Sequence, residues 1–316
     1  LELLRARPDS RSLDLDNIEG DETEVYAKLG LVFVEPERRE DVAPLIELGK
    51  ARPRLVRLDD LRGSLHNHTV ASDGDATLLE MRDAAAAHDY EYLAITDHSQ
   101  SAVYAKGLAA SSLFAQRDEV RALNALGASK CVVLSGVESD ILKDGALDYA
   151  DNILRGLDVV IASVHSRFGQ KGPDLTARMV AAANNPWSDI VGHPTGRLLL
   201  GRAPADYDVS QMLEAAQANG SAVELNANPA RLDLNEKHLA EAKERGLLVS
   251  IAADAHAVDE LDNMEFGVFI ARRAGLTPDD VLNARSLADL LAWLKARRTK
   301  ASARAQARAS EAQPGG

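Results

Sequence analysis

The sequence contains a single cysteine, Cys131, among 316 residues. One thiol excludes a disulfide framework and any cysteine-rich zinc module, and it agrees with a reducing cytosol. Cys131 begins the apolar run CVVL, a predicted strand, so a buried structural thiol is favoured over a nucleophile. We therefore expect a cytoplasmic protein.

Long apolar runs are also absent. No segment approaches the roughly 18 apolar residues that a membrane-spanning helix needs, and no signal peptide is recognisable. The hydrophobic fraction of 46% supports a sizeable core in one large domain or two smaller ones. Because the first residue is Leu1 and not Met, we expect a processed product or an excised piece of a longer protein.

Basic residues are too few to balance the acids, and the formal net charge is -13. This excess argues against nonspecific binding to a phosphate backbone. The C-terminal end reverses the sign, since Lys295 to Ser310 carries six Lys or Arg residues and no acid. We predict that residues 298–316 form a basic, disordered tail, with a nucleic-acid contact as the alternative.

From Leu61 onward, short β-branched runs alternate with helical patterns, which indicates repeated βα units with parallel strands. Seven such runs occur: LRGSLHNH, EYLAITDH, CVVLSGVE, DVVIASVH, DIVGH, AVELNAN and LVSIAADAH. After them, TPDDVLNA and SLADLLAWLKARR predict two closing helices. We predict an α/β barrel over residues 61–297. The segment or linker before it, residues 1–60, contains one helical pattern in DETEVYAKLG.

Most of these runs end on a side chain that can bind a metal ion. They are His66, His68, His98, Glu138, His165, His193, Asp254 and His256, and Asp73 follows in the loop after the first run. In a closed parallel barrel the carboxyl ends of all strands meet at one face, so distant residues share one pocket. The i,i+2 spacing in HNH and DAH places both members of each pair on one face of a strand.

Each of these residues alone has a simpler interpretation, as a hydrogen-bonded core histidine or as an acid at a helix cap or turn. Together, six imidazoles and three carboxylates would leave unsatisfied donors and repelling charges, each costing about 1 to 3 kcal/mol, unless cations are bound. Nine ligands exceed the four that one zinc ion uses, so two or three divalent ions are implied. Nitrogen and oxygen donors suit zinc, manganese or iron(II).

Clustered divalent ions favour phosphoester hydrolysis, because they activate a water and neutralise the phosphoryl and leaving oxygens. Three such ions would add about six positive charges, which offsets the acidic background at the site.

Polar residues that follow the strand ends could contact the substrate. We favour Arg197 and Arg231 as phosphate contacts, since an arginine can bind phosphate through two parallel hydrogen bonds. Asn226 is a candidate to orient ligands or substrate, and Lys106 is a further candidate contact. Arg167, Lys171 and Arg202 also flank strand ends, with ordinary surface charge as the alternative for each. Asp97, adjacent to His98, is expected to point the opposite way and to tie down a neighbouring element.

In order along the chain, LHNHT with the following SDG, ITDHS, GVESDI, ASVHS, GHPTGR, ELNANPARLDL and ADAH resemble the polymerase and histidinol phosphatase (PHP) domain. The resemblance covers about Leu61 to Leu294 and is strongest to the version at the carboxyl end of bacterial family X DNA polymerases. The upstream ETEVYAKLGLVFVEPERRE also resembles the segment that ends the polymerase region in that family. The resemblance implies a distorted seven-stranded (βα)7 TIM-like barrel with three metal ions.

The resemblance also implies an assignment of ligands and an activity. Four residues would hold one ion (His66, His68, Glu138 and Asp254), three a second (Asp73, His98 and His256), and Glu138 would bridge to a third held also by His165 and His193. The implied activity is a manganese-dependent 3′-5′ exonuclease that processes 3′ ends in base excision repair, including cleavage at abasic sites. The implied partners are single-stranded or gapped DNA 3′ ends and an upstream polymerase domain in the full-length protein. Because little of the polymerase region is present, synthesis and gap recognition are not attributed to this chain.

Three alternatives remain open. A small-molecule phosphatase of the histidinol phosphatase type would use the same ions. An amidohydrolase also places two histidines on its first strand, but many such sites add a bridging lysine, and none of the seven strand ends here carries one. A PHP domain that has lost its ligands and serves a structural role is the third, and the complete set of nine positions argues against it.

Overall fold

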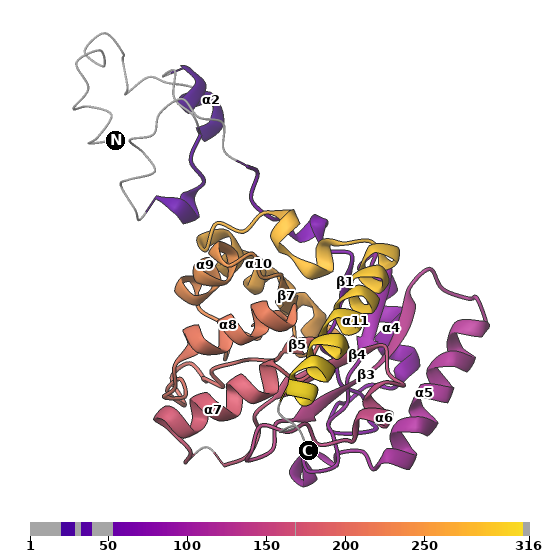
Figure 1. Cartoon of the computed structure of the whole chain (residues 1–316). Coiled ribbons are helices and arrows are strands. Elements are labelled where there is room, and N and C mark those ends of the chain that lie inside the picture. Colours follow the sequence, from indigo (N-terminus) through magenta and orange to yellow (C-terminus); the bar gives the residue numbers. More distant parts are fainter. Residues whose placement is uncertain (1–19, 29–32, 40–52, 168, 312–316) are drawn as a thin grey trace. The chain divides into compact units, whose positions relative to one another are not determined.

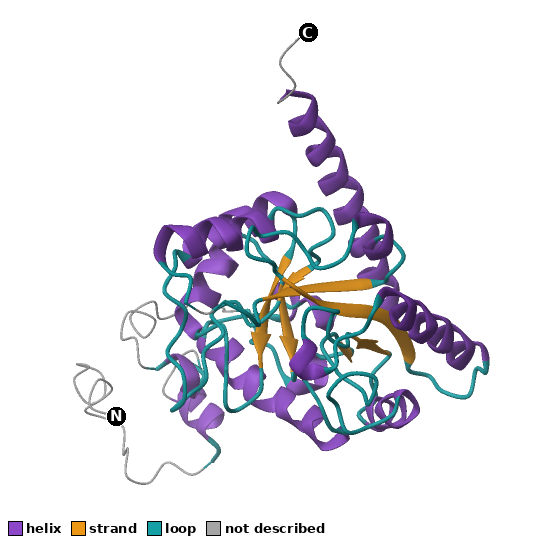
Figure 2. Ribbon diagram, turned by 90° about the horizontal axis from the view of Figure 1, so that it is seen from below, coloured by secondary structure: helices purple, strands orange, loops and turns teal. Residues whose placement is uncertain are grey.

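A single sheet of seven parallel strands, in the order β1 to β7, forms the centre of the barrel unit (Figures 1 and 2). The computed structural model describes residues 20–28, 33–39, 53–167 and 169–311. The strands are β1 Gly63–Ser64, β2 Tyr92–Ile95, β3 Val132–Asp140, β4 Val159–Ser163, β5 Ile190–Val191, β6 Ala222–Asn226 and β7 Val249–Ala252. A parallel bridge between Asn67 and Ala255 joins the chain just after β1 to the chain just after β7. The predicted seven-stranded barrel is confirmed.

Helices follow the strands and surround the sheet (Figure 2). In the barrel unit they are α4 Leu78–Ala87, α5 Ala110–Ala125, α6 Asp151–Leu154, α7 Gly172–Ala183, α8 Val209–Asn219, α9 Glu236–Glu244, α10 Met264–Arg273 and α11 Leu287–Glu311. The 3-10 turns are η3 Leu58–Asp60, η4 Val103–Ala105, η5 Val258–Asn263, η6 Pro278–Asp280 and η7 Leu282–Ala284. None of the helices in the described ranges is both long and apolar enough to span a membrane.

Alternating residues of β2, β3 and β4 supply two apolar layers. On β2, Tyr92 and Ala94 belong to the inner cluster, whereas Leu93 and Ile95 face the helices in the outer one. Leu290 and Leu294 of α11 complete the inner cluster. The helix therefore closes the end of the barrel where the strands begin, and the carboxyl ends stay available for a site.

The C-terminal basic run is helical, which corrects the predicted domain boundary at residue 297. Helix α11 continues through Glu311, so the prediction of a disordered tail is wrong up to that residue, and residues 312–316 lie outside the described part. Its anchor is Asp189, a fully buried acid that accepts hydrogen bonds from Arg297 Nη2 at 2.5 Å and Arg298 Nε at 3.0 Å. Two residues of the basic run, Arg297 and the first residue of the predicted tail, Arg298, are thus structural.

The segment before α11 also differs from the prediction. TPDDVLNA forms the two short turns η6 and η7 and no α-helix, because Val281 leaves the helical conformation to bridge Val249 of β7. The second closing helix is α10, which the sequence patterns did not reveal.

Two compact units divide the chain, Leu1–Arg54 and Leu55–Gly316. Leu55 and Val56 are buried, and the Val56 amide donates to the Leu276 carbonyl at 3.0 Å. The barrel unit therefore begins a few residues before the predicted position 61. In the first unit the predicted helical pattern forms α2, Glu22–Lys28, and a short turn, η2, covers Pro36–Arg38.

Candidate metal centre

The bridge between Asn67 and Ala255 brings four of the predicted ligands side by side. Side chains alternate along extended chain, so His66 and His68 point to the opposite face from Asn67. Asn67 turns away, because its side-chain amide donates to the Ala94 carbonyl at 2.9 Å. Asp254 has a φ of 54° and is therefore not extended, yet its Oδ1 lies 3.1 Å from His68 Nε2, and the ring centroid of His256 lies 4.2 Å from that of His68. The predicted pairs thus meet, and the i,i+2 strand spacing explains the placement of His66 and His68.

Glu138, fully buried at the carboxyl end of β3, is the centre of the cluster. Its Oε1 lies 2.9 Å from His193 Nε2, 3.1 Å from His165 Nε2 and 3.3 Å from His66 Nε2. Its Oε2 lies 2.9 Å from His98 Nδ1 and 3.7 Å from His68 Nε2. One carboxylate thus contacts imidazoles from five different positions.

Two further carboxylates extend the cluster on either side. Asp254 Oδ1 lies 3.1 Å from His68 Nε2 and 3.5 Å from His66 Nε2. Asp73 lies 3.4 Å from His98 Nε2 and 3.5 Å from His256 Nε2. All nine predicted ligands therefore lie in one continuous network at the carboxyl ends of the strands.

The donor geometry fits divalent cations. Three groups of side chains each bring ligand atoms within 4.8 Å of one another: His68 with Asp73, His98 and His256; His66 with His68 and Glu138; and His98 with Glu138 and His165. Within this cluster of described residues, five buried atoms have no hydrogen-bond partner of good geometry: His66 Nε2, His68 Nδ1, His98 Nδ1, His193 Nδ1 and Glu138 Oε2. Unpaired buried polar atoms are costly, and metal ions between these atoms would satisfy them. Each two of the three groups share one residue, Glu138, His68 or His98, so the groups adjoin one another.

Charge within the cluster is balanced by the imidazoles. Burial alone would raise the pKa of Glu138, but the surrounding histidines hold it well below its usual range. Burial would likewise raise the pKa of Asp254, and His66 and His68 hold it well below its usual range. Burial would lower the pKa of His98, yet Glu138 and Asp73 raise it to about 10. Glu138 and Asp140 likewise raise the pKa of His165 to about 9 against the effect of burial. Without metal, several imidazoles therefore carry the positive charge that the carboxylates require.

Two buried carboxylates behind the ligands were not predicted. Glu224 Oε2 lies 2.6 Å from His66 Nδ1, and Asp140 Oδ1 lies 2.6 Å from His165 Nδ1. Each contact fixes which ring nitrogen carries the proton and leaves the other one, Nε2, directed at Glu138. The alternation of side chains along a strand could have indicated both residues. Asp140 lies two positions after Glu138 on β3, and Glu224 lies two positions before Asn226 on β6, so each shares a strand face with a predicted site residue.

The four predicted substrate contacts occupy different surroundings. Asn226 is fully buried and donates to Glu224 Oε1 at 2.9 Å and to Asp254 Oδ2 at 3.0 Å, so it orients ligands. Arg231 Nε lies 3.6 Å from Asp254 Oδ2, and its buried Nη1 has no hydrogen-bond partner. Arg197 donates through Nε to the Arg231 carbonyl at 2.8 Å and through Nη2 to the Leu232 carbonyl, which fixes that loop. Lys106 is exposed at the end of η4 and belongs to none of the three ligand groups.

Asp97 and Cys131 have the structural roles that the sequence predicted. Asp97 accepts hydrogen bonds from the Thr69 amide at 2.8 Å and Gln116 Nε2 at 2.5 Å, so it ties the loop after β1 to α5. Cys131 is buried, and burial raises the pKa of its thiol to about 12. A buried, protonated thiol is a poor nucleophile.

Tyr104 is a further side chain at the site that sequence reasoning missed. Its ring is 68% exposed, yet its centroid lies 6.0 Å from that of His98 and 6.4 Å from that of His165. An exposed aromatic ring next to a cluster of ligands is available to a substrate. Nothing in the sequence of η4 distinguishes it from an ordinary surface tyrosine.

Comparisons with known proteins agree with this architecture. The family model of the PHP domain matches residues 64–228, more than half of the chain, and the chain belongs to this family. It is 44% identical over 274 residues to the DNA polymerase/3′-5′ exonuclease PolX of Bacillus subtilis, covering 87% of this chain and 48% of that protein. The chain thus spans about half the length of that relative.

Shorter relatives and a solved structure are also similar. A probable phosphatase of Thermoanaerobacter sp. is 28% identical over 247 residues, covering 74% of this chain and 95% of that protein. The crystal structure of histidinol phosphate phosphatase from Lactococcus lactis, complexed with zinc, L-histidinol and phosphate, superposes with a TM-score of 0.51. At 18% identity, over 68% of this chain and 94% of that one, this likeness concerns the fold.

Proposed function

We propose that the chain is a divalent-metal-dependent phosphodiesterase that removes nucleotides from DNA 3′ ends, the 3′-5′ exonuclease of 3′-end processing in base excision repair. The observation that carries the proposal is the convergence of nine side chains with nitrogen and oxygen ligand atoms at the carboxyl ends of the strands, five of them imidazoles in contact with the central Glu138. The choice of DNA rests on the 44% identity to a relative named a 3′-5′ exonuclease. Cleavage at abasic sites, an upstream polymerase domain and a cytoplasmic location belong to the same proposal.

The proposed site holds two or three Mn2+ or Zn2+ ions on His66, His68, Asp73, His98, Glu138, His165, His193, Asp254 and His256. When bound, such ions lower the pKa of water and neutralise charge on a phosphoryl group. Arg231, whose guanidinium lies 3.6 Å from Asp254, contacts the scissile phosphate. Asn226 holds the Asp254 carboxylate in place, and Glu224 and Asp140 hold the ring nitrogens of His66 and His165 toward the centre.

The direct test supplies the purified chain with Mn2+ and compares a single-stranded oligonucleotide with histidinol phosphate as substrates. We expect 5′-mononucleotides released from the 3′ end, and loss of that activity with a chelator. His66→Ala and Asp254→Asn should abolish activity with folding intact, whereas His88→Ala, on a partly exposed histidine outside the network, should not. Release of inorganic phosphate without mononucleotides would contradict the proposal, and elemental analysis would count the ions.

The second candidate is a small-molecule phosphatase of the histidinol phosphatase type. It is favoured by the relatives named probable phosphatases, of which the one from Thermoanaerobacter sp. is matched over 95% of its length. Faster turnover of histidinol phosphate than of the oligonucleotide would select it.

A further inference from the structure

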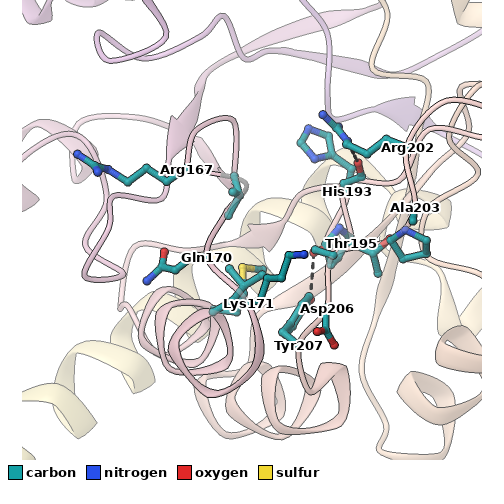
Figure 3. Close-up of a pocket in the computed structure, with 16 residues that line it drawn as sticks. Arg167, Gln170, Lys171, His193, Thr195, Arg202, Ala203, Asp206 and Tyr207 are labelled. Carbon is teal, nitrogen blue, oxygen red and sulfur yellow. Dashed lines mark hydrogen bonds between the residues drawn. The ribbon is translucent and has the colours of Figure 1, made fainter.

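A cavity of about 340 Å3 lies beside the metal centre and shares His193 with it as a wall. It is formed by the loop after β4, by α7 and by the loop after β5 (Figure 3). Both loops emerge from the carboxyl ends of their strands, the same face on which the nine ligands meet. A group bound at the ligands therefore has this cavity within reach.

The walls of the cavity are largely apolar. Val164, Leu175, Met179, Pro194 and Pro204 line it, which suits the flat face of a nucleobase and the sugar beside it. Its volume is at the lower end of the roughly 300–1,000 Å3 that pockets for a single small ligand occupy. The cavity therefore has the size for one nucleoside and not for a longer stretch of strand.

Hydrogen bonds keep the wall next to His193 in a fixed shape. Thr195 donates through its amide and hydroxyl to the buried Asp233 at 3.0 and 2.8 Å, and the Tyr207 hydroxyl donates to the Pro194 carbonyl at 3.0 Å. Arg202 donates through Nε to the Gly196 carbonyl at 2.8 Å. A wall that is already ordered costs little entropy when a ligand binds.

Charges are placed unevenly around the cavity. The Arg202 side chain lies beside His193 in Figure 3, and the Lys171 side chain extends toward Thr195. Asp206 lines the cavity beside Tyr207, away from His193. A phosphate is therefore favoured at the His193 side, and the far end, where a carboxylate repels phosphate, suits an uncharged base.

We propose that this cavity is the subsite for the terminal nucleoside, the one whose 5′-phosphate is cleaved from the strand. The proposal rests on the function proposed above. In the balanced step, water adds to phosphorus, the bond from phosphorus to the 3′ oxygen of the penultimate nucleotide breaks, and that oxygen leaves with the electron pair and takes up a proton. The products are a 5′-mononucleotide, whose base occupies the cavity, and a strand one nucleotide shorter with a 3′ hydroxyl.

The first test measures binding of the product 5′-dAMP, of deoxyribose 5-phosphate and of inorganic phosphate to the Mn2+-loaded chain by calorimetry. We expect dAMP to bind about tenfold or more tightly than deoxyribose 5-phosphate, because only dAMP buries a base. Ala203→Trp, which fills the rim of the cavity from an exposed position, should remove this difference. Ala109→Trp, at an exposed alanine of another loop outside the cavity, should retain it.

A second measurement needs no variant. In the wild-type chain, dAMP should protect Lys171 from acetylation, read by mass spectrometry, while deoxyribose 5-phosphate should protect it less and the exposed Lys130 should react equally in all samples. Three results would each overturn the proposed subsite: equal affinities for dAMP and deoxyribose 5-phosphate, an unchanged preference for dAMP in Ala203→Trp, or a Lys171 that dAMP does not protect. These binding results are separate from turnover, so absence of exonuclease activity would instead overturn the proposed function.

Discussion

Replacing Glu224 by glutamine tests whether a buried carboxylate behind His66 sets the metal affinity of the centre. Glu224 Oε2 lies 2.6 Å from His66 Nδ1, while Oε1 accepts from the His193 amide at 3.1 Å and from Asn226 at 2.9 Å. A glutamine keeps the shape and can still accept both Oε1 hydrogen bonds through its carbonyl oxygen. Its amide group would then face His66 Nδ1 as a donor, which moves the ring proton to Nε2, the atom directed at Glu138.

The magnitude follows from the lost contact. A hydrogen bond to a charged group contributes about 1.5 to 3 kcal/mol, and a tenfold change in binding corresponds to about 1.4 kcal/mol. We therefore expect the affinity for Mn2+ to fall about 10- to 100-fold, the range typical when such a partner of a metal-binding histidine is removed. The same change should raise the Mn2+ concentration needed for half-maximal cleavage, with maximal activity less affected.

The assay is calorimetric titration of the metal-free chain with Mn2+, together with activity as a function of Mn2+ concentration. Glu241→Gln is the matched control, since Glu241 pairs with Arg245 on α9, away from the nine ligands. Unchanged Mn2+ affinity in Glu224→Gln would refute the claim that this carboxylate fixes the proton on His66.

Three further outcomes are expected. Asp189→Asn should destabilise the barrel by about 3 to 5 kcal/mol in urea denaturation, because it leaves the buried Arg297 without its charged partner; a change under about 1 kcal/mol would contradict the anchoring of α11. Tyr104→Ala should raise KM for an oligonucleotide more than it lowers kcat, while Tyr104→Phe retains KM, since a ring contributes about 1 to 3 kcal/mol by stacking on a base. Loading the metal-free chain with Mn2+ at pH 7 should release protons, because the pKa of His98 is raised to about 10 and metal binding needs the neutral ring. The apparent affinity should then rise with pH up to about that value, and heats that do not depend on the ionisation enthalpy of the buffer would exclude this linkage.

The convergence of the nine proposed ligands could be predicted because strand order and position along a strand are both visible in a sequence. Each of the seven runs ends at a recognisable place, and parallel strands in a barrel bring those ends together. The i,i+2 spacing of His66 and His68 was enough to place both on the inner side of the mouth. The positions of residues at strand ends, together with the rule that parallel strands of a barrel end at one face, were therefore enough to predict that these side chains meet.

The features that the sequence did not predict depend on contacts between side chains that are far apart in the chain. Asp140 and Glu224 are charged residues inside buried strands, and their partners, His165 and His66, lie 25 and 158 positions away in sequence. The basic composition of residues 298–316 favours a solvated tail, and Asp189, the buried partner of Arg298, lies 109 positions earlier in the sequence. In each case a side-chain contact decides the role, and no periodic pattern reports which two side chains meet.

The acidic composition is compatible with the proposed phosphate chemistry because three carboxylates are concentrated at the candidate metal centre. Asp73, Glu138 and Asp254 contact six histidines, and burial works against each carboxylate unless positive charge is close. In the metal-free chain, protonated rings such as that of His98 supply this charge, and divalent ions replace those protons on binding. Positive charge therefore offsets the carboxylates in the metal-free chain, and divalent ions would offset them in the loaded one. In the proposed function, bound divalent ions would give this acidic protein a locally positive surface for a phosphodiester, with Arg231 at its edge.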